Sequence, residues 1–81
     1  MRAVFVMIKC QLGQSYAVAD ALVEAIEQTS EVYSTSGQYD LLAKFYLDDD
    51  TDTGHFVCET VQNTSGIADT FTLITFKAFT G

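Results

Sequence analysis

The first third of the chain changes from a strand-like pattern to a helical one. Apolar residues fill both odd and even positions of residues 3–9, which is typical of a strand covered on both faces. After Gly13, apolar residues recur at helical spacing up to Ile26, with acidic residues on the opposite side, and Ser15 is the expected N-cap. The pattern predicts a first strand followed by an amphipathic helix of about three to four turns.

Two further strand-like segments follow, and they enclose a short turn. Residues 32–36 and 41–47 are the two candidate strands, and the second alternates between two sets of apolar side chains. The segment 37–40 between them contains a glycine, which is typical of a hairpin turn. Three consecutive aspartates, residues 48–50, end the second strand. The sequence therefore predicts a β-hairpin with its turn at residues 37–40.

The last third predicts a second helix and a final strand. Asp52 or Thr53 is expected to cap a helix that continues to about Asn63, and Gly66 lies where the chain must leave it. Residues 69–79 are dense in β-branched and aromatic side chains, which favours a strand. The predicted order is strand, helix, strand, strand, helix, strand.

This order predicts an α+β fold that forms one domain over residues 1–81. Right-handed crossovers interleave two strand–helix–strand units into a four-stranded antiparallel sheet with both helices on one face. This is the ferredoxin-like βαββαβ arrangement. A chain of 81 residues leaves no room for a second domain.

The face of the sheet without helices is expected to be apolar as well. In the first strand, Val4 and Val6 point to one side, and Phe5 and Met7 point to the other. Monomers rarely expose so large a continuous apolar surface. A chain of this length also removes only about 60–65% of its unfolded surface from water on folding. We therefore predict an obligate dimer that packs sheet against sheet, which is a dimeric α+β barrel.

The charge balance argues against nucleic acid and membrane partners. Asp and Glu total 11 against four Lys and Arg, a formal net charge of −7. Binding of nucleic acid or of an anionic membrane surface needs clustered cations, and here they are scattered singly. No apolar run approaches the ~20 residues of a transmembrane helix. The two cysteines, Cys10 and Cys58, are too few for a disulfide framework, so a cytoplasmic location with reduced thiols is expected.

The acidic run partly matches the pattern of a calcium loop. Asp48, Asp50, Asp52 and Glu59 fall at positions 1, 3, 5 and 12 of such a loop. Position 6 is Thr53 rather than glycine, and a strand rather than a helix precedes the run. Carboxylates favoured by a helix N-terminus explain the run better, so no metal site is predicted.

The sequence does not predict catalysis. His55 is the single histidine and could act as a general base, but its spacing implies no serine or cysteine nucleophile with an orienting acid. Cys10 and Cys58 are expected to be core residues. The chain has no glycine-rich phosphate loop. We expect neither an enzyme nor a bound cofactor.

The turn at residues 37–40 supports two interpretations. As turn chemistry alone, Gly37 supplies a positive φ and Asp40 bonds local amides. As a site, the same atoms suit a zwitterionic amino acid. Asp40 is an anion for the ammonium group, and the amides of Gly37 and Gln38 can hold the carboxylate. Tyr39 offers an apolar wall with a polar tip.

Two segments resemble one protein family. The segment Val32–Leu42, with its Gly-Gln-Tyr-Asp sequence, resembles the glycine-x-tyrosine-aspartate segment of the effector-binding domain of Lrp/AsnC regulators. The segment Gly66–Thr72 is similar to the glycine, aliphatic, threonine-x-threonine start of that domain's last strand. The likeness spans essentially the whole chain. Full regulators of this family also carry an N-terminal helix-turn-helix domain, which is absent from these 81 residues.

The resemblance implies a stand-alone, RAM-type ligand-binding module. Its dimers are expected to assemble further, into an octamer or decamer ring, and to hold an amino acid between dimers. The residues implied to bind ligand are Thr35, Gly37, Gln38, Tyr39, Asp40, Thr70 and Thr72, the last two from a neighbouring subunit.

Two other functions remain open from the sequence. One is a small enzyme on the same dimeric scaffold, which would need His55 or Tyr39 in a closed pocket. The other is a structural partner that assembles with a full-length regulator through the sheet surface.

Overall fold

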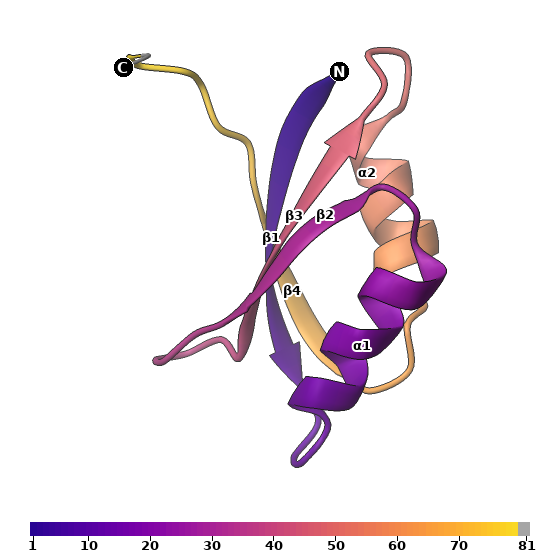
Figure 1. Ribbon diagram of the computed structural model, residues 1–81, viewed down its shortest axis with the longest axis vertical. Coiled ribbons are helices and arrows are strands. Elements are labelled where there is room, and N and C mark those ends of the chain that lie inside the picture. Colours follow the sequence, from indigo (N-terminus) through magenta and orange to yellow (C-terminus); the bar gives the residue numbers. More distant parts are fainter. Residues whose placement is uncertain (80–81) are drawn as a thin grey trace.

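The computed structural model describes residues 1–79, and it contains the predicted ferredoxin-like α+β arrangement. One antiparallel sheet has the strand order β2-β3-β1-β4. The strands are β1 (Arg2–Cys10), β2 (Thr29–Ser34), β3 (Leu41–Leu47) and β4 (Ile67–Leu73). The helical segments are α1 (Ser15–Ala25) and α2 (Thr53–Phe56), which continues as the π-helix η1 (Val57–Val61). Both lie on the same side of the sheet (Figure 1).

The core lies between the sheet and the helical segments, as the alternation in the sequence predicts. Every second residue of β1 and β3 is buried on this side. Phe45 at the centre of β3 is fully buried and meets Phe56 of α2 edge-on, with ring centroids 5.2 Å apart. The other buried side chains are Val4, Val6, Ile8, Cys10, Val18, Leu22, Ile26, Leu41, Ala43, Leu47, Val57 and Val61.

The opposite face, which we call the open face, is also rich in apolar side chains. Phe5 and Met7 of β1 and Leu42 of β3 are half-buried there. Lys44 also lies on this face, with its Nζ 4.9 Å from the ring centroid of Tyr46 and 5.8 Å from that of Phe5. Apolar side chains therefore occupy both faces of the sheet, as the sequence predicts.

The first helix and the hairpin differ from prediction at their ends. Ser15 is the first residue of α1 rather than its N-cap. Gln14 holds that position and its side chain makes no capping bond. β2 begins at Thr29, because pairing with β3 extends back to Phe45. It ends before Thr35, whose amide instead donates across the turn to the Asp40 carbonyl at 2.9 Å.

The second helix is shorter than predicted and changes its winding. Asp52 is its N-cap, as predicted, because its Oδ2 accepts from the His55 amide at 2.9 Å. From Val57 the segment is a π-helix, shown by the bond from the Gln62 amide to the Val57 carbonyl at 2.8 Å. Cys58 is exposed, so its predicted core position is wrong.

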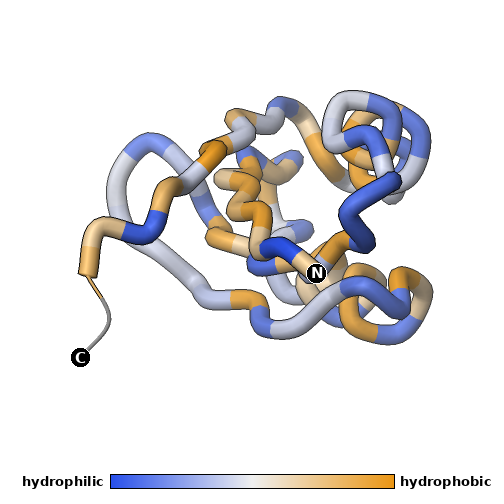
Figure 2. Tube along the Cα trace, turned by 90° about the horizontal axis from the view of Figure 1, so that it is seen from above, coloured by the Kyte–Doolittle hydropathy of each residue, from blue (hydrophilic) through white to orange (hydrophobic). Residues whose placement is uncertain are grey.

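The last strand starts earlier and ends earlier than the predicted residues 69–79. β4 begins at Ile67, which pairs with Cys10, and ends at Leu73, which pairs with Phe5. Residues 74–79, which we call the tail, have strong β propensity but no partner strand. Two of its rings are almost fully exposed, Phe76 at 88% and Phe79 at 96%. The tail departs on the side of the sheet away from the helices (Figures 1 and 2).

Within residues 1–79, none of the helical segments combines the length and the apolar character needed to cross a membrane.

Candidate functional site

The predicted turn is a closed, well-defined loop between β2 and β3. The Thr35 amide donates a hydrogen bond across the turn to the Asp40 carbonyl, and the Thr35 hydroxyl donates to the Tyr39 carbonyl at 2.8 Å. Gly37 has a φ of +108°, a conformation that side-chain-bearing residues rarely adopt. Open space surrounds the position where its Cβ would lie. The backbone at Gly37 is therefore accessible to a ligand.

Asp40 ties this turn to the centre of the sheet. Its Oδ2 accepts from the Cys10 amide at 2.8 Å, and its own amide donates to the Ile8 carbonyl at 2.9 Å. The register of β1 with β4 shifts between Lys9 and Cys10, so the carboxylate satisfies an amide at a β-bulge. The bond engages one carboxylate oxygen and leaves the negative charge in place. Asp40 thus bonds a distant amide of β1 rather than the local amides of the turn interpretation, and it still offers an anion.

Tyr39 lies on the open face beside Phe71 of β4. The two rings are stacked, with centroids 6.3 Å apart and planes 25° apart. Phe71 is 52% exposed. The sequence prediction did not include Phe71 among the site residues. The signal that could have found it is its position between Thr70 and Thr72, which places it on the opposite face of the strand from both.

Thr70 and Thr72 do not join Tyr39 within one protomer. They pair with Ile8 and Val6, whose side chains face the helices, so the two threonines belong to that side of β4. The Thr70 hydroxyl accepts from the Gln62 amide group at 2.7 Å. One protomer therefore brings together residues 35–40 but leaves the two threonines on the other face of the sheet.

Asp40 and Thr70 also line different pockets. Asp40 contributes to a pocket of about 310 Å³ beside the loop from β1 to α1. Its other lining residues are Lys9, Cys10, Gln11, Leu12, Gly13, Ser15 and Ala68. Thr70 contributes to one of about 300 Å³ together with Gln62, Ile67, Ala68 and Asp69.

Cys10 is a buried thiol at the edge of the Asp40 pocket, as its predicted core position requires. Burial raises the pKa of the Cys10 thiol, and the nearby Asp40 carboxylate raises it further, against the opposing effect of a hydrogen bond with Ser15. The thiolate is therefore disfavoured, which is expected of a packing residue rather than a nucleophile.

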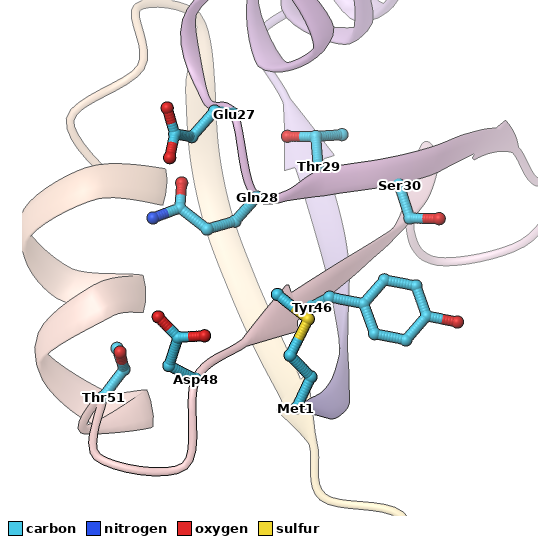
Figure 3. A pocket seen from close by; sticks show the side chains of 8 residues that line it. All are labelled: Met1, Glu27, Gln28, Thr29, Ser30, Tyr46, Asp48 and Thr51. Carbon is cyan, nitrogen blue, oxygen red and sulfur yellow. The ribbon is translucent and has the colours of Figure 1, made fainter.

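A separate pocket of about 340 Å³ lies at the other end of the sheet (Figure 3). It combines the carboxylates of Glu27 and Asp48 with the aromatic ring of Tyr46. Its other lining residues are Met1, Gln28, Thr29, Ser30 and Thr51. None of the predicted site residues lines it. Sequence reasoning missed this pocket because three segments distant in the chain form it.

The acidic run 48–50 belongs to a turn held by Arg2. The guanidinium donates to the Asp48 carbonyl at 2.6 Å, to the Thr51 carbonyl, and to the Thr53 hydroxyl at 2.9 Å. Within residues 1–79, no group of three or more His, Cys, Asp or Glu side chains could hold a metal ion.

His55 lies at the surface of α2. Its side chain is 80% exposed, and its Nδ1 is 4.0 Å from the Glu59 carboxylate one turn later. The enclosed surroundings that the enzyme interpretation needs are not found around this histidine.

Comparison with known proteins agrees with the fold and with the family resemblance. The family model of the Lrp/AsnC ligand binding domain matches residues 3–80. The crystal structure of FFRP-DM1 has a TM-score of 0.83 and 28% identity, and the match covers 94% of this chain and 100% of that chain. TTHA0845 from Thermus thermophilus has a TM-score of 0.78 and 31% identity, over 100% of both chains. Comparison with curated proteins finds no match.

A regulator of transcription shares the fold at lower identity. The complex of the transcriptional regulator NMB0573 from Neisseria meningitidis with L-Met has a TM-score of 0.80 and 18% identity. The match covers 98% of this chain but only 52% of the regulator.

The fold and the matched residues define the class as a ligand-binding domain of the kind found in transcriptional regulators. The chain belongs to the Lrp/AsnC ligand-binding domain family. The resemblance inferred from the Gly37–Asp40 turn and from residues 66–72 is thereby confirmed. The family is one of regulatory, effector-binding domains rather than of enzymes.

Proposed function

We propose that this protein is an oligomeric sensor module that binds an amino acid at contacts between subunits. The observation that carries the proposal is the turn at residues 35–40 in a member of this family, with accessible backbone at Gly37 and the carboxylate of Asp40 three residues away. The related regulator NMB0573 was crystallised with L-Met, which supports an amino acid as the ligand class.

In the proposed site, different groups of the turn bind the two opposite charges of a zwitterionic amino acid. Asp40 accepts the ammonium group through the oxygen that does not bond Cys10. Amides around Gly37 and Gln38 donate to the carboxylate, since no glycine side chain shields them. The family resemblance implies that Thr70 and Thr72 enter the site from a neighbouring subunit, and in their own protomer they lie on the other face of the sheet from Tyr39.

The open face supplies the first level of assembly. A second copy covers its apolar side chains, and dimers assemble further into an octamer or decamer ring with ligand between them. Ligand binding then shifts the balance between assembly states, which a full-length regulator in the cytoplasm reads as a population shift.

Calorimetric titration against the twenty amino acids at up to millimolar concentration tests ligand binding. Asp40→Asn is the decisive variant, because its side-chain oxygen can still accept from the Cys10 amide while the charge is lost. We expect Asp40→Asn to weaken binding by at least about tenfold, the effect of ~1.4 kcal/mol, with little change in thermal stability. If none of the twenty binds the unaltered protein, the amino-acid proposal is wrong.

Sedimentation velocity tests the dimer. Met7 is half-buried in the centre of the open face, so Met7→Glu places one carboxylate from each protomer in the proposed interface. We expect the variant to sediment as a monomer at micromolar concentration, because an unpaired charge is costly to bury. Met7→Leu is the matched control and keeps the dimer. A monomeric unaltered protein would refute the proposed interface.

Co-assembly with a full-length regulator is a second proposed role. Two observations favour it: the fold of this chain matches 52% of the chain of a regulator, and the open face is apolar. Mixed oligomers of the two purified proteins, formed without ligand and lost in Met7→Glu, would support it.

A further inference from the structure

The tail, residues 74–79, and the outer edge of β2 both lack a strand partner within residues 1–79. β2 and β4 are the outer strands of the sheet, so each has one edge that pairs with no strand of the described chain. The tail continues from β4 but joins neither edge. All of its residues are exposed, and it leaves on the side of the open face (Figures 1 and 2). Unpaired backbone along an edge strand is a template for a further strand.

The tail leaves the sheet at the end that carries the pocket of Figure 3. β4 ends at Leu73, which pairs with Phe5 near the start of β1. The lining of the pocket includes Met1 before β1, Thr29 at the start of β2 and Asp48 just after β3. The tail and the pocket therefore share one end of the sheet but lie at its opposite edges, because β1 and β3 separate β4 from β2.

The geometry of the proposed dimer can bring the tail of one copy to the pocket of the other. A two-fold axis parallel to the strands places the β4 edge of one sheet over the β2 edge of its partner, with the same ends together. Packed sheets are about 10 Å apart, and an extended tail spans about 20 Å at about 3.3 Å per residue. The tail is therefore long enough to pass from its own sheet to β2 of the partner.

The charges of the tail and the pocket are complementary. Lys77 is the charged residue of the tail, and it makes no ion pair with the side chains of residues 1–79. Glu27 and Asp48 lie on the same side of the pocket and also have no ion-pair partner in that range (Figure 3). The last turn of α1, just before Glu27, contains no basic residue, so the helix C-terminus adds to the negative potential. These groups favour an ammonium group as their partner.

We propose that the tail of each protomer adds to β2 of its partner as an outer strand and places Lys77 beside Glu27 and Asp48 of the partner subunit. This inference rests on the proposed sheet-to-sheet dimer. Because side chains alternate along an extended segment, Ile74 and Phe76 point to the opposite side from Lys77. There they pack over the edge of the apolar open faces, which removes two exposed side chains from water. The exchange of tails thus covers the free edge of both β2 strands.

Exchange of charges between two chains tests the proposed contact. One chain carries Lys77→Glu, and the other carries Glu27→Lys with Asp48→Asn, which turns the pocket from acidic to basic. The two chains, one of them isotope-labelled, are unfolded together in urea and refolded, and native mass spectrometry counts the three kinds of dimer. In a mixed dimer both contacts join opposite charges, whereas each pure dimer has two contacts between like charges. We expect the equilibrium constant for mixing to exceed its statistical value by at least about tenfold.

The matched control replaces the pocket substitution by one elsewhere on the surface. Asp20→Lys with Asp48→Asn makes the same change in net charge, but Asp20 is an exposed residue of α1 that does not line the pocket. Mixed with the Lys77→Glu chain, this control should give statistical proportions. An equal excess of mixed dimers in the control would mean that net charge drives the pairing, and would overturn the inference.

The remaining outcomes separate the tail exchange from the proposed function. Statistical proportions in the test pair mean that the tail contact is wrong while the dimer stands. If one chain with all three substitutions regains the thermal stability that the parent chains lose, while mixing stays statistical, Lys77 contacts its own protomer and the inference is wrong. If the unaltered protein sediments as a monomer, the dimer and the tail exchange fail together. Amino-acid titration of each variant tests ligand binding separately, because none of residues 35–40 lines this pocket.

Discussion

The hydrogen bond from the Cys10 amide to Asp40 gives the sharpest stability prediction. Asp40→Ala removes the acceptor and leaves the amide of a buried residue at a β-bulge without its partner. A hydrogen bond to a charged group contributes about 1.5–3 kcal/mol. Asp40 itself is only half-buried, so water can partly replace it, and the lower part of that range applies. We expect Asp40→Ala to lower the free energy of unfolding by about 1.5–2 kcal/mol.

Urea unfolding at fixed protein concentration, followed by circular dichroism, measures this loss. For a domain of this size, 1 kcal/mol corresponds to about 4–8 °C in Tm, so thermal unfolding should show a decrease of about 6–16 °C. Asp40→Asn keeps a neutral acceptor and should lose less than about 1 kcal/mol. Equal losses in the two variants would mean that the charge, rather than the bond to Cys10, determines stability. A loss below about 0.5 kcal/mol in Asp40→Ala would refute the role of the bond.

Three further predictions concern the backbone and the two thiols. Gly66→Ala should cost more stability than Gly37→Ala in thermal unfolding. Both positions have positive φ, but only the Cβ at Gly66 would lie 2.9 Å from the Val18 side chain, so equal losses would contradict the packing argument. Cys58 should react with a maleimide at least about tenfold faster than Cys10 at pH 8, because only Cys58 is exposed, and mass spectrometry locates the label. Burial raises the pKa of Cys10 above its ordinary value of 9.0, so the folded protein holds this proton more tightly than the unfolded chain. This proton's stabilisation of the folded state is complete below the ordinary pKa and is lost as pH rises through the pKa of the folded protein. The free energy of unfolding above pH 9 should therefore depend less on pH in Cys10→Ala.

The fold was largely predictable because periodicity encodes which side of an element is buried. The alternation in residues 41–47 matches β3, and the apolar spacing after Gly13 matches α1. The ends were less predictable, since they depend on partners. Thr35 has the β propensity of a strand residue, but it makes its hydrogen bonds across the turn. The tail has strong β propensity but lacks a neighbouring strand.

The candidate site was predictable in part, for a similar physical reason. Local chemistry identified Gly37 and Asp40, because the glycine conformation and the short-range bonds of the turn depend on nearby residues. The bond from Asp40 to Cys10 joins residues thirty positions apart, and the contact between Tyr39 and Phe71 depends on sheet register. Neither could be read from spacing alone. The π-helical winding of η1 also has no signal in the apolar pattern.

The unpaired tail has a consequence for how the protein must be handled and made. A ribbon of β-forming residues that projects Phe76 and Phe79 into water is a ready template for another chain. While the tail is uncovered, each new chain is exposed to aggregation, so folding competes with precipitation. Chains that are made or refolded slowly and at low concentration should therefore yield more native protein than chains made or refolded rapidly at high concentration.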